Sequence, residues 1–290
     1  FQFIHPDVAG ESRDLMWPSK DQAEVPRYLY LGELAGEANF HKAESSTKGF
    51  IRWIADLVTG EAVPVILQRP QSGLVDESGR IFVTDTSRQA VYVFDQQQGR
   101  LDIWEHAVGM IHFSSPTGIA LGMDGEVFVA DSNLGFVARL NRRGENIGVI
   151  GKGLLKRPVG VAFDTLQNQL YVADTYAHDI KVFDVEGHLL QTLGQRGDAE
   201  GEFNFPTHVS ADAAGRLYVT DSLNQRIQVF DANGQFQRAF GSLGDVPGSF
   251  TRPKGAAADR AGHVYVVDAA FDNLQVFDEQ GRLLLNWGEA

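Results

Sequence analysis

The chain has 290 residues, of which 43% are hydrophobic, with a formal net charge of −13 and no cysteine. The lack of cysteine excludes disulfides, thiol catalysis, cysteine-ligated metal and thioether-attached haem. The acidic balance and the lack of a cluster of basic residues argue against nucleic acid as a partner, and no apolar run of about 18 residues predicts a transmembrane segment.

The chain begins with a stretch that does not share the pattern of the rest. We expect residues 1–13 to form a tail, in which Phe1–Ile4 alternates well enough to add one edge strand. Since the chain begins at Phe1 and not at a methionine, we expect that a signal or lipid-anchor segment was removed. This predicts an extracytoplasmic location, either periplasmic, on the cell surface or secreted.

From residue 14 onward, a proline and an aspartate recur at a fixed distance. Each proline is followed fifteen or sixteen residues later by an aspartate that closes an apolar run such as IFVTD or LYVAD. The pairs are Pro70 and Asp85, Pro116 and Asp131, Pro158 and Asp174, Pro206 and Asp221, and Pro253 and Asp268. A weaker sixth copy starts at Pro18 and reaches Glu33. The prolines lie 42 to 52 residues apart, which is the length of one four-stranded propeller blade.

Each unit contains four strand-like runs, separated by turns in which Asp opens the turn and Gly supplies a positive φ. A meander of four strands cannot bury both of its faces alone, so the units must pack on one another. We therefore predict an all-β fold, a six-bladed β-propeller of four-stranded antiparallel blades, forming one domain over residues 14–290. The expected blades are residues 14–69, 70–115, 116–157, 158–205, 206–252 and 253–290.

The first unit departs most from the others. Its expected inner strand, Pro18–Glu24, is too polar for a buried strand and indicates an irregular blade. The unit also carries an insertion, Leu34–Gly49, where the other copies have about five residues. Phe40 stands among small and charged neighbours there, which favours a loop at the rim of the propeller.

Two linkers carry a resemblance to a known family. They read GQRGDAEGEF before Pro206 and GSLGDVPGSF before Pro253, and each precedes a run of the type LYVTDSLNQRIQVFD. This pattern resembles NHL repeats, well over residues 70–290 and loosely over 14–69. The degenerate Trp-Pro first unit is similar to that of bacterial NHL propellers that are exported or lipid-anchored. The resemblance implies the propeller fold and says almost nothing about activity.

The two ends of a propeller blade have different sequences. One end has the regular Asp…Gly turns, whereas the other has the irregular loops between second and third strands and the linkers between blades. Since irregular loops on a rigid scaffold usually carry binding, we expect the binding face there. The candidate residues are Phe40, Arg88, Tyr176, His178, His208, Lys254 and Phe271. The recurrent Asp85, Asp131, Asp174, Asp221 and Asp268 are interpreted as structural acceptors of backbone amides in the adjoining loops.

Catalytic alternatives find little support. Propeller lyases with zinc use three converging histidines, whereas here His208 is the one histidine expected on an inner strand. Calcium-dependent lactonase propellers need axial Glu, Asn and Asp side chains, but the inner strands here are mostly small or apolar. We therefore predict a non-catalytic binding scaffold for a protein or an extracellular polymer, without metal or cofactor. The alternative is a metal-dependent hydrolase or lyase that uses the axial channel, and the oligomeric state stays open.

Overall fold

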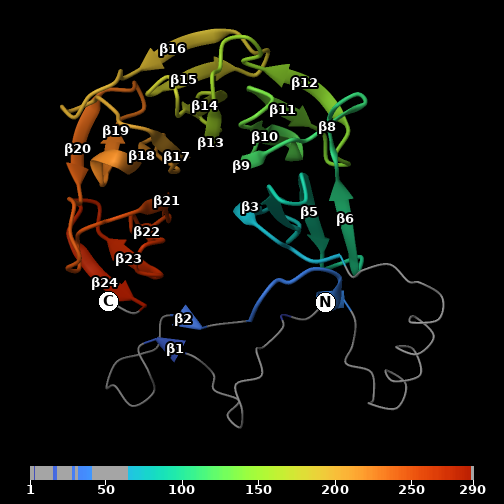
Figure 1. Cartoon of the computed structure of the whole chain (residues 1–290), viewed down its shortest axis with the longest axis horizontal. Coiled ribbons are helices and arrows are strands. Elements are labelled where there is room, and N and C mark those ends of the chain that lie inside the picture. The colour runs from blue at the N-terminus through green and yellow to red at the C-terminus, as the bar shows by residue number, and fades with distance from the viewer. Residues whose placement is uncertain (1–2, 4–15, 18–27, 30–31, 41–64, 289–290) are drawn as a thin grey trace.

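The structure is a computed structural model that describes residue 3 and residues 16–17, 28–29, 32–40 and 65–288. Within these residues, five four-stranded antiparallel sheets surround a central axis as the blades of a propeller (Figure 1). Each blade follows chain order from an inner strand beside the axis to an outer strand at the rim. The predicted all-β propeller of four-stranded antiparallel blades is confirmed.

The blades keep the numbers of the repeat units. Blade two consists of β3 (Pro70–Val75), β4 (Ile81–Asp85), β5 (Ala90–Asp95) and β6 (Arg100–Trp104). Blade three consists of β9 (Pro116–Leu121), β10 (Val127–Asp131), β11 (Phe136–Leu140) and β12 (Asn146–Ile150). Blade four consists of β13 (Pro158–Asp164), β14 (Gln169–Asp174), β15 (Asp179–Asp184) and β16 (Leu189–Leu193). Blade five consists of β17 (Pro206–Ala211), β18 (Leu217–Asp221), β19 (Arg226–Phe230) and β20 (Phe236–Phe240). Blade six consists of β21 (Pro253–Ala258), β22 (Val264–Asp268), β23 (Asn273–Phe277) and β24 (Leu283–Trp287).

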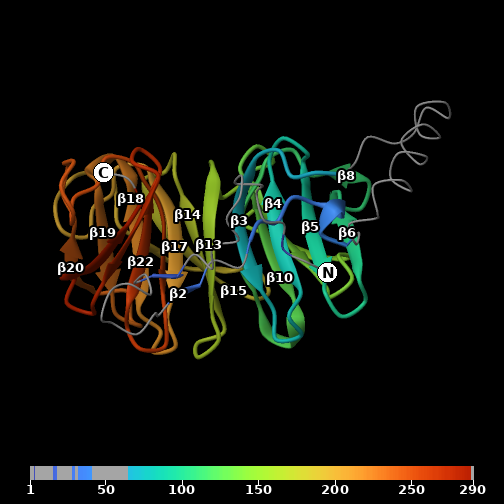
Figure 2. The ribbon, with the colours of Figure 1, turned by 90° about the horizontal axis from the view of Figure 1, so that it is seen from below.

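The first unit is described only in part. β1 (Met16–Trp17) pairs antiparallel with β2 (Tyr28–Leu29), and both lie between blade six and blade two in two perpendicular views (Figures 1 and 2). The described residues thus contain five complete blades, and the pair β1–β2 lies where the expected sixth blade belongs. The polar run Pro18–Glu24, the tail strand Phe1–Ile4 apart from Phe3, and residues 41–49 of the insertion lie outside the described residues.

The remaining elements are short. Three 3-10 helices are η1 (Glu37–Phe40), η2 (Met123–Gly125) and η3 (Ser222–Asn224). A hairpin of β7 (His106–Val108) and β8 (Ile111–His112) lies in the connection from blade two to blade three. Ala107 and Phe113 are buried and join the apolar core between these blades, so the hairpin is anchored to the propeller wall.

The repeated proline marks the start of every described inner strand. Each proline pairs in register with the aspartate that ends the second strand, as Pro116 does with Asp131, and a register shift follows at once. A strand can begin with proline because that position needs no backbone donor. The proline and aspartate of the sequence pattern are therefore neighbours in the sheet.

Packing around the axis explains the small residues of the inner strands. A Cβ atom added to Gly118 would lie 2.4 Å from the carbonyl oxygen of Val159 on the next inner strand. At Gly160 it would lie 2.7 Å from the Cα of His208. Glycine is required at these two positions because backbone meets backbone there.

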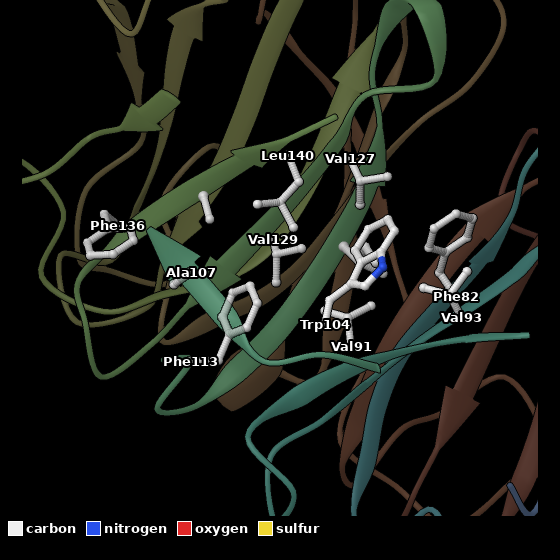
Figure 3. Packing of buried hydrophobic residues seen from close by; sticks show 12 residues of the cluster. Phe82, Val91, Val93, Trp104, Ala107, Phe113, Val127, Val129, Phe136 and Leu140 are labelled. Carbon is white, nitrogen blue, oxygen red and sulfur yellow. The ribbon is translucent and has the colours of Figure 1, made fainter. Parts of the chain in front are cut away.

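The hydrophobic core lies between blades and not within them. In the cluster of Figure 3, Phe82, Val91 and Trp104 of blade two face Val127, Val129 and Leu140 of blade three. The rings of Phe82 and Trp104 meet edge to face with centroids 5.5 Å apart. Similar clusters join blades three and four, four and five, and five and six. Because both faces of blades two to five are covered, the middle strands of these blades are apolar nearly throughout.

Candidate functional site

The propeller has two ends, which we name by the connections they carry. The loop face holds the loops between second and third strands, such as 86–89, together with the linkers that lead into each inner strand. The turn face holds the Asp…Gly turns, for example the one in which the amide of Gly79 donates to the carbonyl of Asp76 at 2.9 Å. β5 therefore runs from Ala90 at the loop face to Asp95 at the turn face.

The five repeated aspartates lie beneath the loop face, and their side chains are fully buried. The carboxylate of Asp131 accepts from the amides of Ser114 and Ser115 in the linker and of Asn133 and Leu134 in the following loop, at 2.7 to 3.0 Å. The same two linker positions donate to Asp85, Asp174 and Asp268. The carboxylates of Asp85, Asp131 and Asp268 also accept from amides of the loop that follows, so they tie a linker to a loop.

Blade five breaks this repeated bonding. Asp221 accepts from a single linker amide, that of Asn204 at 2.7 Å, and its remaining contacts come from side chains. These side chains are Asn224 (2.8 Å), Arg226 (2.9 Å) and Gln228 (3.1 Å). The next linker amide, that of Phe205, donates instead to Nδ1 of His178 in the neighbouring blade at 3.2 Å.

Phe205 also has an unusual backbone. Its φ is +54°, whereas no other residue before an inner-strand proline has a positive φ in the described chain. A bulky residue in this region costs of the order of 1–3 kcal/mol and persists only when its surroundings hold it. The linker into blade five is therefore held in a strained form beside His178.

A shallow depression lies at this place, with a volume of about 470 Å³, lined by Lys156, Tyr176, His178 and Phe205. The rings of His178 and Phe205 pack edge to face, with their centroids 4.5 Å apart. The ring of Tyr176 also packs edge to face on Phe205, with a centroid distance of 6.1 Å and an interplanar angle of 86°. Tyr176 is 54% exposed, while His178 is 8% exposed. The guanidinium of Arg157 lies 5.0 Å from the centroid of the Tyr176 ring. The depression thus combines aromatic walls with cations.

The local charges leave the depression positive. Lys181 lies 2.6 Å from Asp179 and 3.2 Å from Asp174 and pairs with both carboxylates. Together with Lys156 and Arg157, three cations stand against these two anions. Burial raises the pKa of Asp179, and the hydrogen bond from Lys181 opposes that shift. Lys156 acts on Asp179 only through longer-range attraction, and neither Lys156 nor Arg157 forms an ion pair within the described residues.

The structure brings together only two of the candidate residues, Tyr176 and His178. Arg88 lies on the loop face of blade two, where its Nε donates to the carbonyl of Ile66 at 3.4 Å. Lys254 and Phe271 lie at the loop end of blade six, away from the depression. These residues share a face without forming one site.

Phe40 does not lie where the sequence suggested. Its ring stacks on Phe94 with centroids 6.1 Å apart, and it packs with Leu34 against the buried Tyr92 of blade two. Phe94 lies next to Asp95, at the turn-face end of β5. Phe40 therefore packs toward the turn-face end of the blade, because the apolar surface formed by Phe94 lies there. It is not an exposed residue of the loop face.

His208 lies half-buried on β17, with its ring 3.6 to 3.7 Å from the position a Cβ of Gly255 would take. Burial lowers the pKa of this imidazole to about 4 from 6.5. Thr220 is the cross-strand neighbour of His208. The hydroxyls of Thr220 and Ser210 are buried without a protein partner in the described chain. His208 therefore belongs to a neutral polar group in the wall between blades five and six.

Phe205 and Lys156 were missed by the sequence reasoning. A comparison of the residue before each inner-strand proline carries the signal: the five units have Arg69, Ser115, Arg157, Phe205 and Arg252. An aromatic residue at a position otherwise held by arginine or serine marks the blade that differs. Lys156 has no comparable signal, since charged residues are common in linkers.

The described residues contain neither a group of metal-ligating side chains nor a membrane-spanning helix. Among them, no three His, Asp or Glu side chains lie close enough together to share a metal ion. No helix found in this part of the chain has the length and apolar character needed to cross a membrane.

Comparisons with known proteins agree with the fold. Residues 155–183 match the NHL repeat family, and residues 210–285 match a family described as 6-bladed beta-propeller. NHL repeat-containing protein 2 of Bos taurus is 30% identical over 126 residues, which cover 36% of this chain and 17% of that protein. The chain thus spans only a small part of the curated relative, and its resemblance to NHL-repeat propellers is confirmed.

Two solved structures have the same fold. One is in the nidogen/laminin complex, with a TM-score of 0.61 and 19% identity, covering 76% of this chain and 80% of that one. The other is virginiamycin B lyase from Staphylococcus aureus, with a TM-score of 0.58 and 13% identity, covering 76% and 70%. At these identities the likeness shows the propeller fold alone.

Proposed function

We propose that this protein is a non-catalytic binding scaffold that captures another protein on its loop face. The observation that carries the proposal is the aromatic and cationic depression between the loops of blades four and five. Rings such as Tyr176 supply large contact area with little loss of conformational freedom, and tyrosine and arginine dominate interface hot spots. Arg157 and the exposed Tyr176 provide both types in direct contact.

Exposed aliphatic side chains on the same face support a protein partner over a carbohydrate polymer. The loops and linkers expose Met110, Ile111, Leu154, Leu223, Leu243 and Val246. On the turn face, Met123 and Leu166 are exposed in the turns, and Val75 is exposed directly before the turn of blade two. Aliphatic side chains gain by packing on another protein, whereas a sugar chain needs flat rings and paired hydrogen-bonding groups.

The fold is also compatible with the rival class. One of the structural neighbours is a lyase and another lies in a protein–protein complex, so the fold itself does not choose between catalysis and binding. Among the described residues, no three His, Asp or Glu side chains are grouped as a metal-dependent enzyme would need. The proposal of a binding scaffold therefore rests on the residues of the loop face alone.

Site-specific photocrosslinking tests the proposal. A photoreactive amino acid is placed at residue 176 or 223 on the loop face, and at residue 123 or 166 on the turn face as matched exposed controls. Each variant is exposed to cell-envelope and cytosolic fractions of the source organism, and adducts are identified by mass spectrometry. We expect one protein adduct from residues 176 and 223, from the envelope fraction. Adducts from the turn face alone, or adducts to polysaccharide alone, would contradict the proposal.

Metal analysis with an activity screen tests the rival. Stoichiometric zinc or calcium in the purified protein, together with turnover of a lactone or ester, would support the metal-dependent hydrolase or lyase. A protein free of such metal that yields the loop-face adduct would support the scaffold.

A further inference from the structure

The depression contains an unused hydrogen-bond donor. Nδ1 of His178 accepts from the Phe205 amide, so in the neutral ring the proton is on Nε2. Within the described residues, Nε2 has no hydrogen-bond partner, and it is not one of the buried atoms left without one, so it reaches solvent although most of the residue is buried. This N–H is therefore open to an acceptor from outside the chain.

The cation at the rim specifies the charge of that acceptor. Lys156 lines the depression and forms no ion pair with another described residue, and the nearby carboxylates Asp174 and Asp179 both pair with Lys181. An ammonium and an imidazole N–H that face one hollow fit a carboxylate, which accepts through both oxygens. This local charge is opposite to the net charge of the chain.

The remaining walls specify an apolar neighbour for the carboxylate. Tyr176 and Phe205 present their rings to the depression, and Leu223 is exposed beside it, since its amide donates to Asn204. A ligand that carries only a charge would leave these rings in water. A peptide with an acidic residue next to a bulky apolar residue would cover both parts of the site.

The combination occurs in one blade of the five that are described. The residue at the position of His178 has a positive φ in every one of these blades, and the residues there are Gln89, Gly135, His178, Gln225 and Asp272. Blade four is thus the one with an imidazole at this position, and the next linker is the one with Phe205. The positive φ of His178 is shared by the equivalent residues of the other described blades, whereas the imidazole ring occurs at this position only in blade four of these five.

We propose that the depression is a subsite for an aspartate or glutamate side chain of a partner peptide. The carboxylate binds between Nε2–H of His178 and the ammonium of Lys156, and a neighbouring bulky side chain packs on Tyr176 and Phe205. The inference rests on the proposed function and names the chemistry of its partner. Phosphate and uronic acid sugars share the negative charge, and they enter the test as competing ligands.

Nuclear magnetic resonance of the full chain gives the test, with the Phe205 amide as reporter. The probes are the capped peptides Ac-Leu-Glu-Phe-NH2 and Ac-Leu-Gln-Phe-NH2, inorganic phosphate and galacturonic acid. We expect the Glu peptide to shift the Phe205 amide and to saturate, at least tenfold more tightly than the Gln peptide. Equal binding of the two peptides, or tighter binding of phosphate or galacturonic acid, would overturn the inference.

Variants separate the two groups from general effects. Lys156→Met removes the cation and keeps the stem, and we expect at least a fivefold loss for the Glu peptide and none for the Gln peptide. Lys152→Met, on the same linker but outside the depression, is the matched control and should bind as the parent does. His178→Gln takes the residue of blades two and five, so it keeps the backbone form and should also weaken the Glu peptide.

The inference and the proposed function can fail separately. If loop-face crosslinking finds a protein partner while Lys156→Met and Lys152→Met bind the Glu peptide alike, the subsite is wrong and the scaffold stands. If the peptide binds as expected but adducts form only on the turn face, the scaffold proposal fails and the subsite remains as a peptide site.

Discussion

The backbone amide of Phe205 donates a hydrogen bond to Nδ1 of His178, 3.2 Å away in the neighbouring blade. In the other four described blades, the equivalent amide binds the buried aspartate of its own blade. This exchange of partner joins the linker into blade five to the loop of blade four. The aromatic depression is a consequence of the exchange, because it places the Phe205 ring against His178.

The repeated aspartates are expected to stabilise the fold. Asp131→Ala leaves four backbone amides without an acceptor and should lower the free energy of unfolding by roughly 1–3 kcal/mol, and Asp221→Ala should fall in the same range. Urea unfolding followed by tryptophan fluorescence measures both. The control is Asp198→Ala, at an exposed position, which should change stability by less than about 0.5 kcal/mol. An unchanged midpoint in Asp221→Ala with loss of a bound metal would show a ligand role instead.

Two glycines at the same repeat position should respond differently to alanine. At Gly118 the new Cβ meets the Val159 carbonyl oxygen at 2.4 Å, and we expect a loss of about 1–3 kcal/mol because backbone atoms must move. At Gly255 the nearest atoms belong to the His208 ring at 3.6 Å, an ordinary contact, so Gly255→Ala should be tolerated. Thermal midpoints of both variants decide this, and equal losses would mean that the inner strands are not packed as described.

His208 should make stability depend on pH. In the unfolded chain its ring takes up a proton near pH 6.5, whereas burial lowers the folded pKa to about 4. Between these values the unfolded state binds more protons, so the stabilisation is complete above about pH 6.5 and is lost as pH falls toward 4. The full loss amounts to at most about 3 kcal/mol.

The variant His208→Ser, which takes the residue found at this position in blade two, isolates that effect. Its free energy of unfolding should fall less between pH 7.5 and 4.5 than that of the parent, by up to about 2 kcal/mol. Denaturant midpoints at the two pH values measure the difference. Parallel pH profiles of parent and variant would show that burial does not hold the ring neutral.

Phe40 should matter for stability and not for binding. Phe40→Ala removes a ring packed on Phe94, so we expect a loss of roughly 1–3 kcal/mol in the free energy of unfolding. The affinity for the Glu peptide should stay the same, since Phe40 lies on the side of blade two toward the turn face. If Phe40→Ala had the stability of the parent and bound the Glu peptide more weakly, Phe40 would be a binding residue of the loop face after all.

The sequence was sufficient for the repeat because its signals are local. The proline that opens each inner strand, the aspartate that ends the second strand and the Asp…Gly turns are all set by short-range backbone geometry. The same reasoning found Tyr176 and His178, since they lie on an irregular loop. It did not reveal that Phe40 packs on Phe94, because the apolar surface on which that ring packs belongs to another unit of the chain.

The core of the site could not be predicted from the sequence. Whether the amide of Phe205 binds Asp221 or His178 depends on the positive φ of Phe205, which the proline–aspartate spacing does not reveal. Lys156 has no ion pair with another described residue, whereas Lys181 binds the neighbouring carboxylates, and such pairing appears only in three dimensions. The aromatic residue before Pro206 was the one visible sign.

The central claim is that the loop face binds a protein, and the affinity for the partner identified by crosslinking tests it most directly. Tyr176→Ala removes the exposed ring of the depression, whereas Leu166→Ala removes a side chain on the turn face that is 68% exposed. Calorimetric titration should give at least a tenfold weaker dissociation constant for Tyr176→Ala and an unchanged one for Leu166→Ala. An unchanged affinity for Tyr176→Ala, or a loss confined to Leu166→Ala, would contradict the claim.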